Sequence, residues 1–221
     1  MKKIIYKNNY ISLDFVNEIR EYFNKINDSL FASKGPYLNQ KTKLGWQGCW
    51  DRNLHYEKSD SPIHRVVSKL KEDFGDFEIA ESSIRYLSSP FLPHSDIRSF
   101  DWLTEYRNKG YKEGFVYLIP LWWKNGHTPG TAFYNNPAKI DEPLYSDMLD
   151  ILPNYSTEYE IENRNFSVRE IIKWESPGDL IAWENFQWHS SCSYGDITYS
   201  KDTWVKEFIS IETWIKSENN Q

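Results

Sequence analysis

Three residues of this chain could together bind a metal ion: His94 and Asp96, two positions apart, and the distant His189. On an extended strand, side chains two positions apart point to the same face, so His94 and Asp96 could reach one ion. Two imidazoles and one carboxylate on one side of an ion leave its opposite side open. That arrangement is typical of non-haem Fe(II) enzymes that activate oxygen. The His-x-Asp tripeptide alone is common, so the hypothesis depends on the surrounding elements.

Both parts of this ligand set follow extended runs of the sequence. Residues 84–93 lead into His94, and residues 178–183 lead through a short connection to His189. The two runs can bring their ligands together only if the strands fold against each other, as they do in a jelly roll. The other histidines have weaker contexts: His64 lies in a predicted helix, and His55 and His127 lie in a loop and a turn.

Helical periodicity is confined to the first third of the chain. Apolar residues recur at three- and four-residue spacing over 14–27 and again over 61–75. Ser61 is a suitable N-cap, Pro62 suits the first helical position, and Gly75 is a typical stop. These patterns predict two N-terminal helices.

From Phe77 onward the pattern changes to short β-type runs separated by Gly and Pro turns. We therefore expect an α+β chain that is mainly β, forming a single domain over 1–221 with a helical part at 1–76 and a β core at 77–216. The segment 34–60 reads as a long aromatic loop. The predicted strands are 77–91, 114–123, 130–135, 158–162, 167–174, 179–184 and 203–215.

Composition bounds the class of protein. The chain has 221 residues, ten Trp and fifteen Tyr, an aromatic content typical of a folded protein. The net charge of −6 gives no support for nucleic-acid binding. Cys49 and Cys192 suggest neither a disulfide framework nor a zinc site. No signal peptide or membrane-spanning run is evident, so we expect a soluble cytoplasmic protein with no membrane partner.

In this context the chain resembles the Fe(II)- and 2-oxoglutarate-dependent dioxygenases, particularly their prolyl-hydroxylase-like and phage-type members. The resemblance covers residues 80–215 and implies a double-stranded β-helix (jelly roll, cupin-like) with N-terminal helices packed on its larger sheet. Five segments carry the resemblance in the family's order: 91–96, 115–121, 130–134, 177–191 and 205–211.

The resemblance implies that His94, Asp96 and His189 bind Fe(II), with no catalytic residue beyond these ligands. The co-substrates would be O2 and 2-oxoglutarate, which would chelate the iron and leave as succinate and CO2. The expected reaction is hydroxylation of an unactivated C–H bond in a small molecule, amino acid or peptide. Asp96 favours hydroxylation over halogenation, because halogenating members carry a small residue at this position.

The distal carboxylate of 2-oxoglutarate requires a buried cation, because an unpaired charge inside a barrel is costly. Family members place an Arg or Lys about ten positions after the distal histidine, but this chain has Tyr199 there. Lys201 and Lys206 follow His189 by 12 and 17 positions. We favour Lys206, because it lies in a run of strand period, and we interpret 192–202 as an inserted loop.

Other residues could contact the same carboxylate. Ser210 would share a strand face with Lys206, and Tyr86 and Tyr117 could each donate a phenol hydroxyl, although core packing is the ordinary role of a strand tyrosine. If neither lysine serves, the cation could come from Arg85, Arg98 or Arg169.

Two alternatives remain open from the sequence. A cupin-type metal-binding protein or isomerase would need no 2-oxoglutarate and no buried cation on the closing strand. A non-catalytic carbohydrate-binding β-sandwich would use the many tryptophans and no metal. Substrate identity is not readable, and the expected lid segments are 34–60, 97–113 and 135–157.

Overall fold

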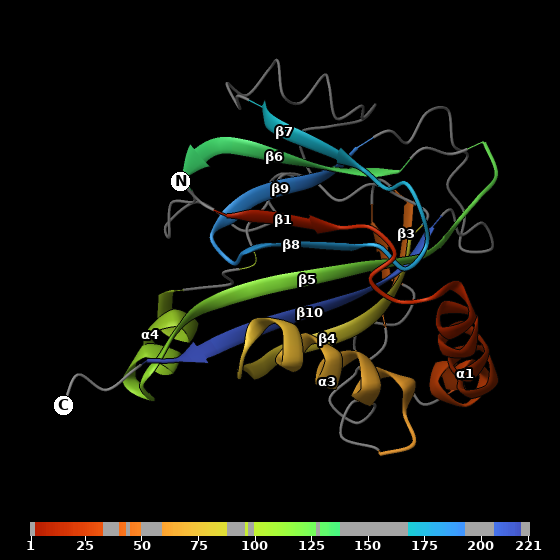
Figure 1. Ribbon diagram of the computed structural model, residues 1–221, viewed down its shortest axis with the longest axis horizontal. Helices are drawn as coiled ribbons and strands as arrows, with labels where there is room; N and C mark the ends of the chain where they lie inside the picture. Colours follow the sequence, from red (N-terminus) through yellow and green to blue (C-terminus); the bar gives the residue numbers. More distant parts are fainter. Residues whose placement is uncertain are drawn as a thin grey trace.

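The computed structural model describes residues 3–32, 40–42, 45–49, 59–87, 96, 100–126, 129–137, 168–192 and 206–217. Helices precede most of the strands, as Figure 1 shows. In chain order the elements are β1 (Ile4–Lys7), α1 (Leu13–Ala32), β2 (Gln40–Thr42), β3 (Gly45–Cys49), α3 (Pro62–Phe74), β4 (Glu78–Leu87), α4 (Phe100–Asn108), β5 (Tyr111–Trp123), β6 (Gly130–Pro137), β7 (Val168–Lys173), β8 (Leu180–Glu184), β9 (Gln187–Cys192) and β10 (Lys206–Lys216).

The strands form two antiparallel sheets. The larger has the order β1-β8-β5-β10-β4-β3-β2, and the smaller has the order β7-β6-β9. The chain passes from the larger sheet to the smaller between β5 and β6, and again between β8 and β9 (Figure 1). The protein is therefore mainly β, with N-terminal helices, as the sequence predicted.

Both faces of the larger sheet are covered, and β5 shows how. Successive side chains of a strand point to opposite faces. Tyr117 and Ile119 pack with apolar residues of α1 and α3, whereas Val116 and Leu118 pack with residues of the smaller sheet such as Phe133. One core thus lies between the helices and the sheet, and a second lies between the two sheets.

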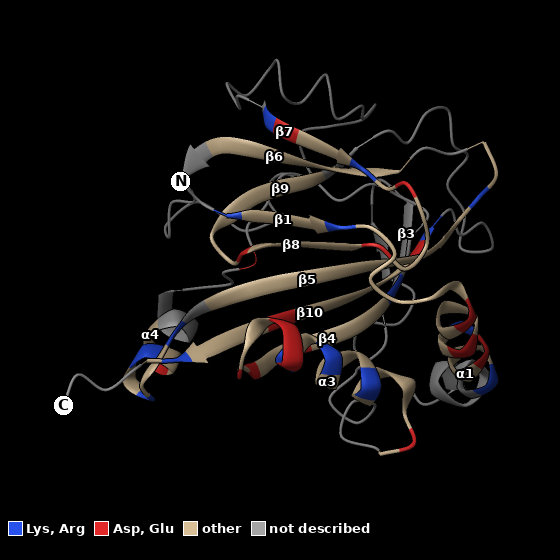
Figure 2. Ribbon diagram, viewed as in Figure 1, with Lys and Arg blue, Asp and Glu red and all other residues tan. Residues whose placement is uncertain are grey.

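Helix α3 begins and ends where its sequence signals predicted. The Ser61 hydroxyl accepts a hydrogen bond from the backbone N–H of Ile63 at 3.3 Å, and Pro62 occupies the first turn. Gly75 has a φ of 87° and donates its N–H to the Lys71 carbonyl at 2.9 Å. Charged residues of both signs lie along α1 and α3 (Figure 2).

Several expectations differ from the structure. The N-terminal part is not wholly helical, because β1 pairs with β8 at the edge of the larger sheet. The segment 34–60 was expected as a loop, but its described part contains β2 and β3, which extend the sheet beyond β4. The segment 97–113 was also expected as a loop, and its described part contains α4 and the start of β5.

Two further points concern the strands and the helices. His189 lies within the strand β9, which begins at Gln187, inside the connection expected before this histidine, and pairs with β6. The predicted strand 158–162 lies outside the described residues. Among the described helices, none is long and apolar enough to cross a membrane.

Candidate metal and co-substrate site

A pocket lies between the two sheets, and strand alternation explains its lining. From β10 it receives Lys206, Phe208 and Ser210, whose shared face points away from the helices. The remaining lining residues come from β4, β5, β6, β8, β9 and the segments beside them: Arg85, Asp96, Leu118, Thr131, Trp174, Trp183, His189 and Ser190.

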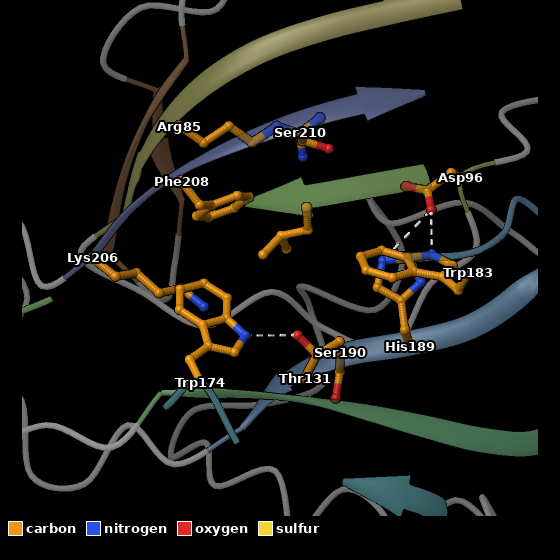
Figure 3. Close-up of a pocket in the computed structure, with 11 residues that line it drawn as sticks. Arg85, Asp96, Thr131, Trp174, Trp183, His189, Ser190, Lys206, Phe208 and Ser210 are labelled. Carbon is orange, nitrogen blue, oxygen red and sulfur yellow. Dashed lines mark hydrogen bonds and ion pairs between the residues drawn. The ribbon is translucent and has the colours of Figure 1, made fainter. Parts of the chain in front are cut away.

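At one end of this pocket, Asp96 and His189 face each other (Figure 3). The Asp96 Oδ2 atom lies 3.6 Å from His189 Nε2, and both side chains are only 8% exposed. The sequence placed these residues 93 positions apart and predicted that they would meet. The backbone N–H of Asp96 donates to the Asn185 carbonyl at 3.2 Å, so the turn between β8 and β9 holds the carboxylate segment near His189.

The tautomer of His189 follows from its other ring nitrogen. Nδ1 lies 3.0 Å from the Gln187 carbonyl oxygen, which can only accept, so Nδ1 carries the proton. Burial, with a smaller contribution from the nearby Arg85 guanidinium, lowers the pKa of His189 to about 4. At neutral pH the imidazole is therefore uncharged, with its Nε2 lone pair directed at Asp96.

This geometry places two acceptors opposite each other in a buried site. A neutral Nε2 cannot donate to the Asp96 carboxylate, so the 3.6 Å approach is not an ion pair at neutral pH. A cation between the two atoms could be bound by both. Two neighbouring ligands of one ion, each bonded at about 2.1 Å, lie roughly 3 Å apart, so a small inward movement would suffice.

The chemical types of these two side chains also suit a metal ion. A carboxylate and an imidazole with a bonded outer nitrogen are the expected ligands of a non-haem iron or a related divalent ion. Among the residues that the structure describes, no group of three or more His, Cys, Asp and Glu side chains is placed to hold an ion. Two of the three predicted ligands, Asp96 and His189, lie together, and the third, His94, lies outside the described residues.

The opposite end of the pocket carries a buried cation. Lys206 is 1% exposed, and its ammonium lies 4.5 Å from the centroid of the Trp174 ring. Trp174 in turn donates its indole N–H to the Thr131 hydroxyl at 3.2 Å, which fixes the ring against the ammonium. Ser210, predicted to share this face, lines the same pocket and is 7% exposed. Figure 3 shows Lys206 on the opposite side of the pocket from Asp96 and His189.

The guanidinium of Arg85 also lines the pocket, but carboxylates already surround it. Its Nη2 lies 3.5 Å from Glu81 and 3.7 Å from Glu212, and its Nε donates to the Ser83 hydroxyl at 2.9 Å. Arg169 donates to the Gln187 side chain at 3.2 Å and does not line the pocket. Of these candidate cations, Lys206 and Arg85 line the pocket and Arg169 does not.

Not every candidate reaches this pocket. Tyr117 points to the opposite face of β5, where its ring packs against Phe74 and Phe77, and burial raises the pKa of its phenol. Its predicted role as a donor to the co-substrate does not match that position, because a strand turns alternate side chains to opposite faces. The exposed His64 lies on α3, away from the pocket. The candidates that fall outside the described part are Lys201, Arg98 and the side chain of Tyr86.

Sequence reasoning missed the role of one pocket residue. Trp183 is buried in the core between the two sheets, and its indole N–H also donates to Asp96 Oδ2 at 3.2 Å. The alternation of side chains along a strand could have predicted the direction of Trp183. It follows Ile181 by two positions, so both point from β8 into the core between the two sheets. No sequence pattern predicted that Asp96 would accept this hydrogen bond.

The chain matches no protein-family model and no curated protein sequence. Its fold does match solved structures. The non-heme alpha ketoglutarate dependent carbocyclase SnoK aligns over 100% of this chain and 84% of its own, with a TM-score of 0.58 and 11% identity. The corresponding epimerase SnoN aligns over 100% and 83%, with a TM-score of 0.54 and 10% identity. Both come from nogalamycin biosynthesis.

A third similar structure is AviO1 from Streptomyces viridochromogenes Tue57. It aligns over 99% of this chain and 91% of its own, with a TM-score of 0.53 and 12% identity. At such identities the likeness concerns the fold alone. The chain therefore shares its fold with these structures, two of which are alpha ketoglutarate dependent enzymes.

Proposed function

We propose that the protein is an Fe(II)- and 2-oxoglutarate-dependent oxygenase whose strands close into a double-stranded β-helix within a single domain. The observation that carries the proposal is the layout of one pocket. Two buried acceptors, Asp96 Oδ2 and His189 Nε2, face each other at one end, and the buried ammonium of Lys206 lies at the other. A metal-bound dicarboxylate requires both features, a cation site for its distal carboxylate and ligands for the ion.

In this proposal each pocket residue has a physical task. Asp96, His189 and the undescribed His94 hold the metal, and the Gln187 carbonyl keeps the His189 proton on Nδ1. Lys206 binds the distal carboxylate, and the Ser210 hydroxyl lies on the same strand face to donate to it. The apolar walls exclude water, which strengthens these electrostatic interactions.

Iron and 2-oxoglutarate, when bound, would supply the oxidising chemistry. The proposed overall reaction consumes O2, 2-oxoglutarate and R–H, and releases R–OH, succinate and CO2. We propose a small molecule, amino acid or peptide as R–H. The similar structures include a carbocyclase and an epimerase, so an assay should detect any product of an attacked C–H bond as well as the alcohol.

The proposal is tested by reconstituting the protein with Fe(II) under anaerobic conditions, adding 2-oxoglutarate and then O2, and measuring succinate. The assay is run with and without a metabolite panel, with product masses read by mass spectrometry. We expect 2-oxoglutarate-dependent succinate from the wild type, none from His189→Ala, and wild-type amounts from His64→Ala, which removes an exposed imidazole on α3. Absence of succinate from folded, iron-loaded wild type would overturn the proposal.

The same samples separate the two alternatives. A cupin-type protein or isomerase would bind iron through His189 without consuming 2-oxoglutarate. A carbohydrate-binding sandwich would keep its ligand affinity in His189→Ala.

A further inference from the structure

Both described metal-ligand candidates are held by the same hairpin, formed by β8 and β9. His189 belongs to β9 itself, and the Gln187 carbonyl on that strand binds its Nδ1 proton. Asp96 comes from a distant part of the sequence, but its backbone N–H reaches the Asn185 carbonyl in the hairpin turn. Its carboxylate accepts the indole N–H of Trp183, on β8, at 3.2 Å.

Trp183 contacts both ligand candidates. Its ring centroid lies 4.6 Å from that of His189, at an interplanar angle of 50°, while its N–H reaches Asp96 Oδ2. The ring is 1% exposed and packs edge-on against Phe133 at 5.4 Å. Rotation of the indole would therefore collide with its neighbours, so the direction of the N–H is set by the core.

The chemical type of this donor is informative. An indole N–H is neutral and can only donate, so it fixes a carboxylate without neutralising it or competing for the ion. A lysine or arginine in its place would offset the charge that attracts a divalent cation. Outer partners of this kind orient ligands, and their removal typically weakens metal binding about 10–100-fold.

We infer that Trp183 is a positioning residue for the metal site, holding the Asp96 carboxylate at the angle and distance from His189 Nε2 that a divalent ion requires. The inference rests on the proposed function, because it concerns the same site. It adds a residue of β8 that touches neither the ion nor the substrate.

The test compares Mn(II) affinities of wild type, Trp183→Phe and Trp174→Phe, measured from the electron paramagnetic resonance signal of free Mn(II). Trp174→Phe is a matched control, because it removes an indole N–H in the same pocket whose acceptor is Thr131 instead of Asp96. We expect Trp183→Phe to bind Mn(II) at least about tenfold more weakly and Trp174→Phe to bind it as the wild type does. The visible spectrum of Co(II)-loaded protein should change in Trp183→Phe alone.

A second variant guards against misfolding. Benzothienylalanine introduced at position 183 keeps the bicyclic shape and removes only the N–H, so it should retain the wild-type melting temperature and reproduce the weaker Mn(II) binding. Wild-type affinity in Trp183→Phe or in this variant would overturn the inference and leave the proposed function standing. Equal weakening in Trp183→Phe and Trp174→Phe would also overturn it, since packing alone would then explain the loss. Wild type that binds no Mn(II), Co(II) or Fe(II) would overturn the proposed function itself.

Discussion

The ammonium of Lys206 lies 4.5 Å from the centroid of the Trp174 ring, and the lysine side chain is buried between the two sheets. A buried lysine is costly unless charge or aromatic density compensates for the lost water. The Trp174 ring provides part of that compensation, and a bound dicarboxylate would provide more.

Replacing Lys206 by Met should therefore weaken 2-oxoglutarate binding while leaving metal binding unchanged. Losing one partner of a buried charge pair costs about 2–5 kcal/mol, so the KM for 2-oxoglutarate should rise about 30-fold or more. Steady-state succinate formation at varied 2-oxoglutarate measures it. Lys216→Met is the matched control, because Lys216 lies on the same strand and is exposed. A KM within twofold of wild type in Lys206→Met would remove Lys206 from the site and return Lys201 to consideration.

The strand face on which Lys206 lies could be predicted from the sequence for a definite physical reason. The run at 206–210 has strand period, so Lys206, Phe208 and Ser210 had to share one face. The approach of Asp96 to His189 was likewise anticipated, because each follows an extended run of the sequence. The sequence pattern could not predict which side chains these residues contact, such as the ring of Trp174 beside the Lys206 ammonium.

The two faces of β5 illustrate a different limit. Val116, Tyr117, Leu118 and Ile119 are all buried, so the strand shows no alternation between apolar and polar residues. Nothing in such a run indicates which face meets the helices and which meets the smaller sheet. That is why Tyr117 was a plausible donor to the co-substrate from the sequence, whereas in the structure it lies on the face of β5 away from the pocket.

Tyr117→Phe should consequently leave co-substrate binding unaltered. The phenol lies on the helix-covered face, among aromatic rings, with the sheet itself between it and the pocket. We expect a KM for 2-oxoglutarate within about twofold of wild type in the succinate assay. An increase of tenfold or more would contradict the position of Tyr117, and a parallel Ser210→Ala variant shows the effect expected of a hydroxyl that does line the pocket.

Helix α1 should contribute to stability through its buried stripe. Ile19 is fully buried against the larger sheet, whereas Leu13 at the start of the same helix is 60% exposed. Ile19→Ala should lower the free energy of unfolding by about 2–4 kcal/mol, the usual cost of a buried cavity. Leu13→Ala should change it by less than about 0.5 kcal/mol. Urea unfolding followed by tryptophan fluorescence measures both, and equal effects would mean that α1 does not dock as described.

Gly178 offers the sharpest test of how the N-terminal segment meets the sheet. It has a φ of 89°, and the Ile11 N–H donates to its carbonyl at 2.9 Å while its own N–H donates to Pro120 at 2.8 Å. A Cβ at this position would collide with the Ile11 carbonyl oxygen. Gly126 has a φ of 82° but no atom within 4 Å of such a Cβ. Both glycines thus have a positive φ, which strains any other residue. Gly178 differs from Gly126 in its close approach to the Ile11 carbonyl oxygen.

Gly126→Ala should therefore lower the free energy of unfolding by about 1–2 kcal/mol, the cost of a left-handed conformation for an L-residue. Gly178→Ala carries the same strain and must also push the segment at Ile11 away from the sheet, so its loss should reach about 3 kcal/mol or more. Equilibrium urea unfolding of the two variants gives the difference directly. If the two losses were equal, the contact between Ile11 and Gly178 would not constrain the fold, and the docking of the N-terminal segment beside β8 would have to depend on the pairing of β1 alone.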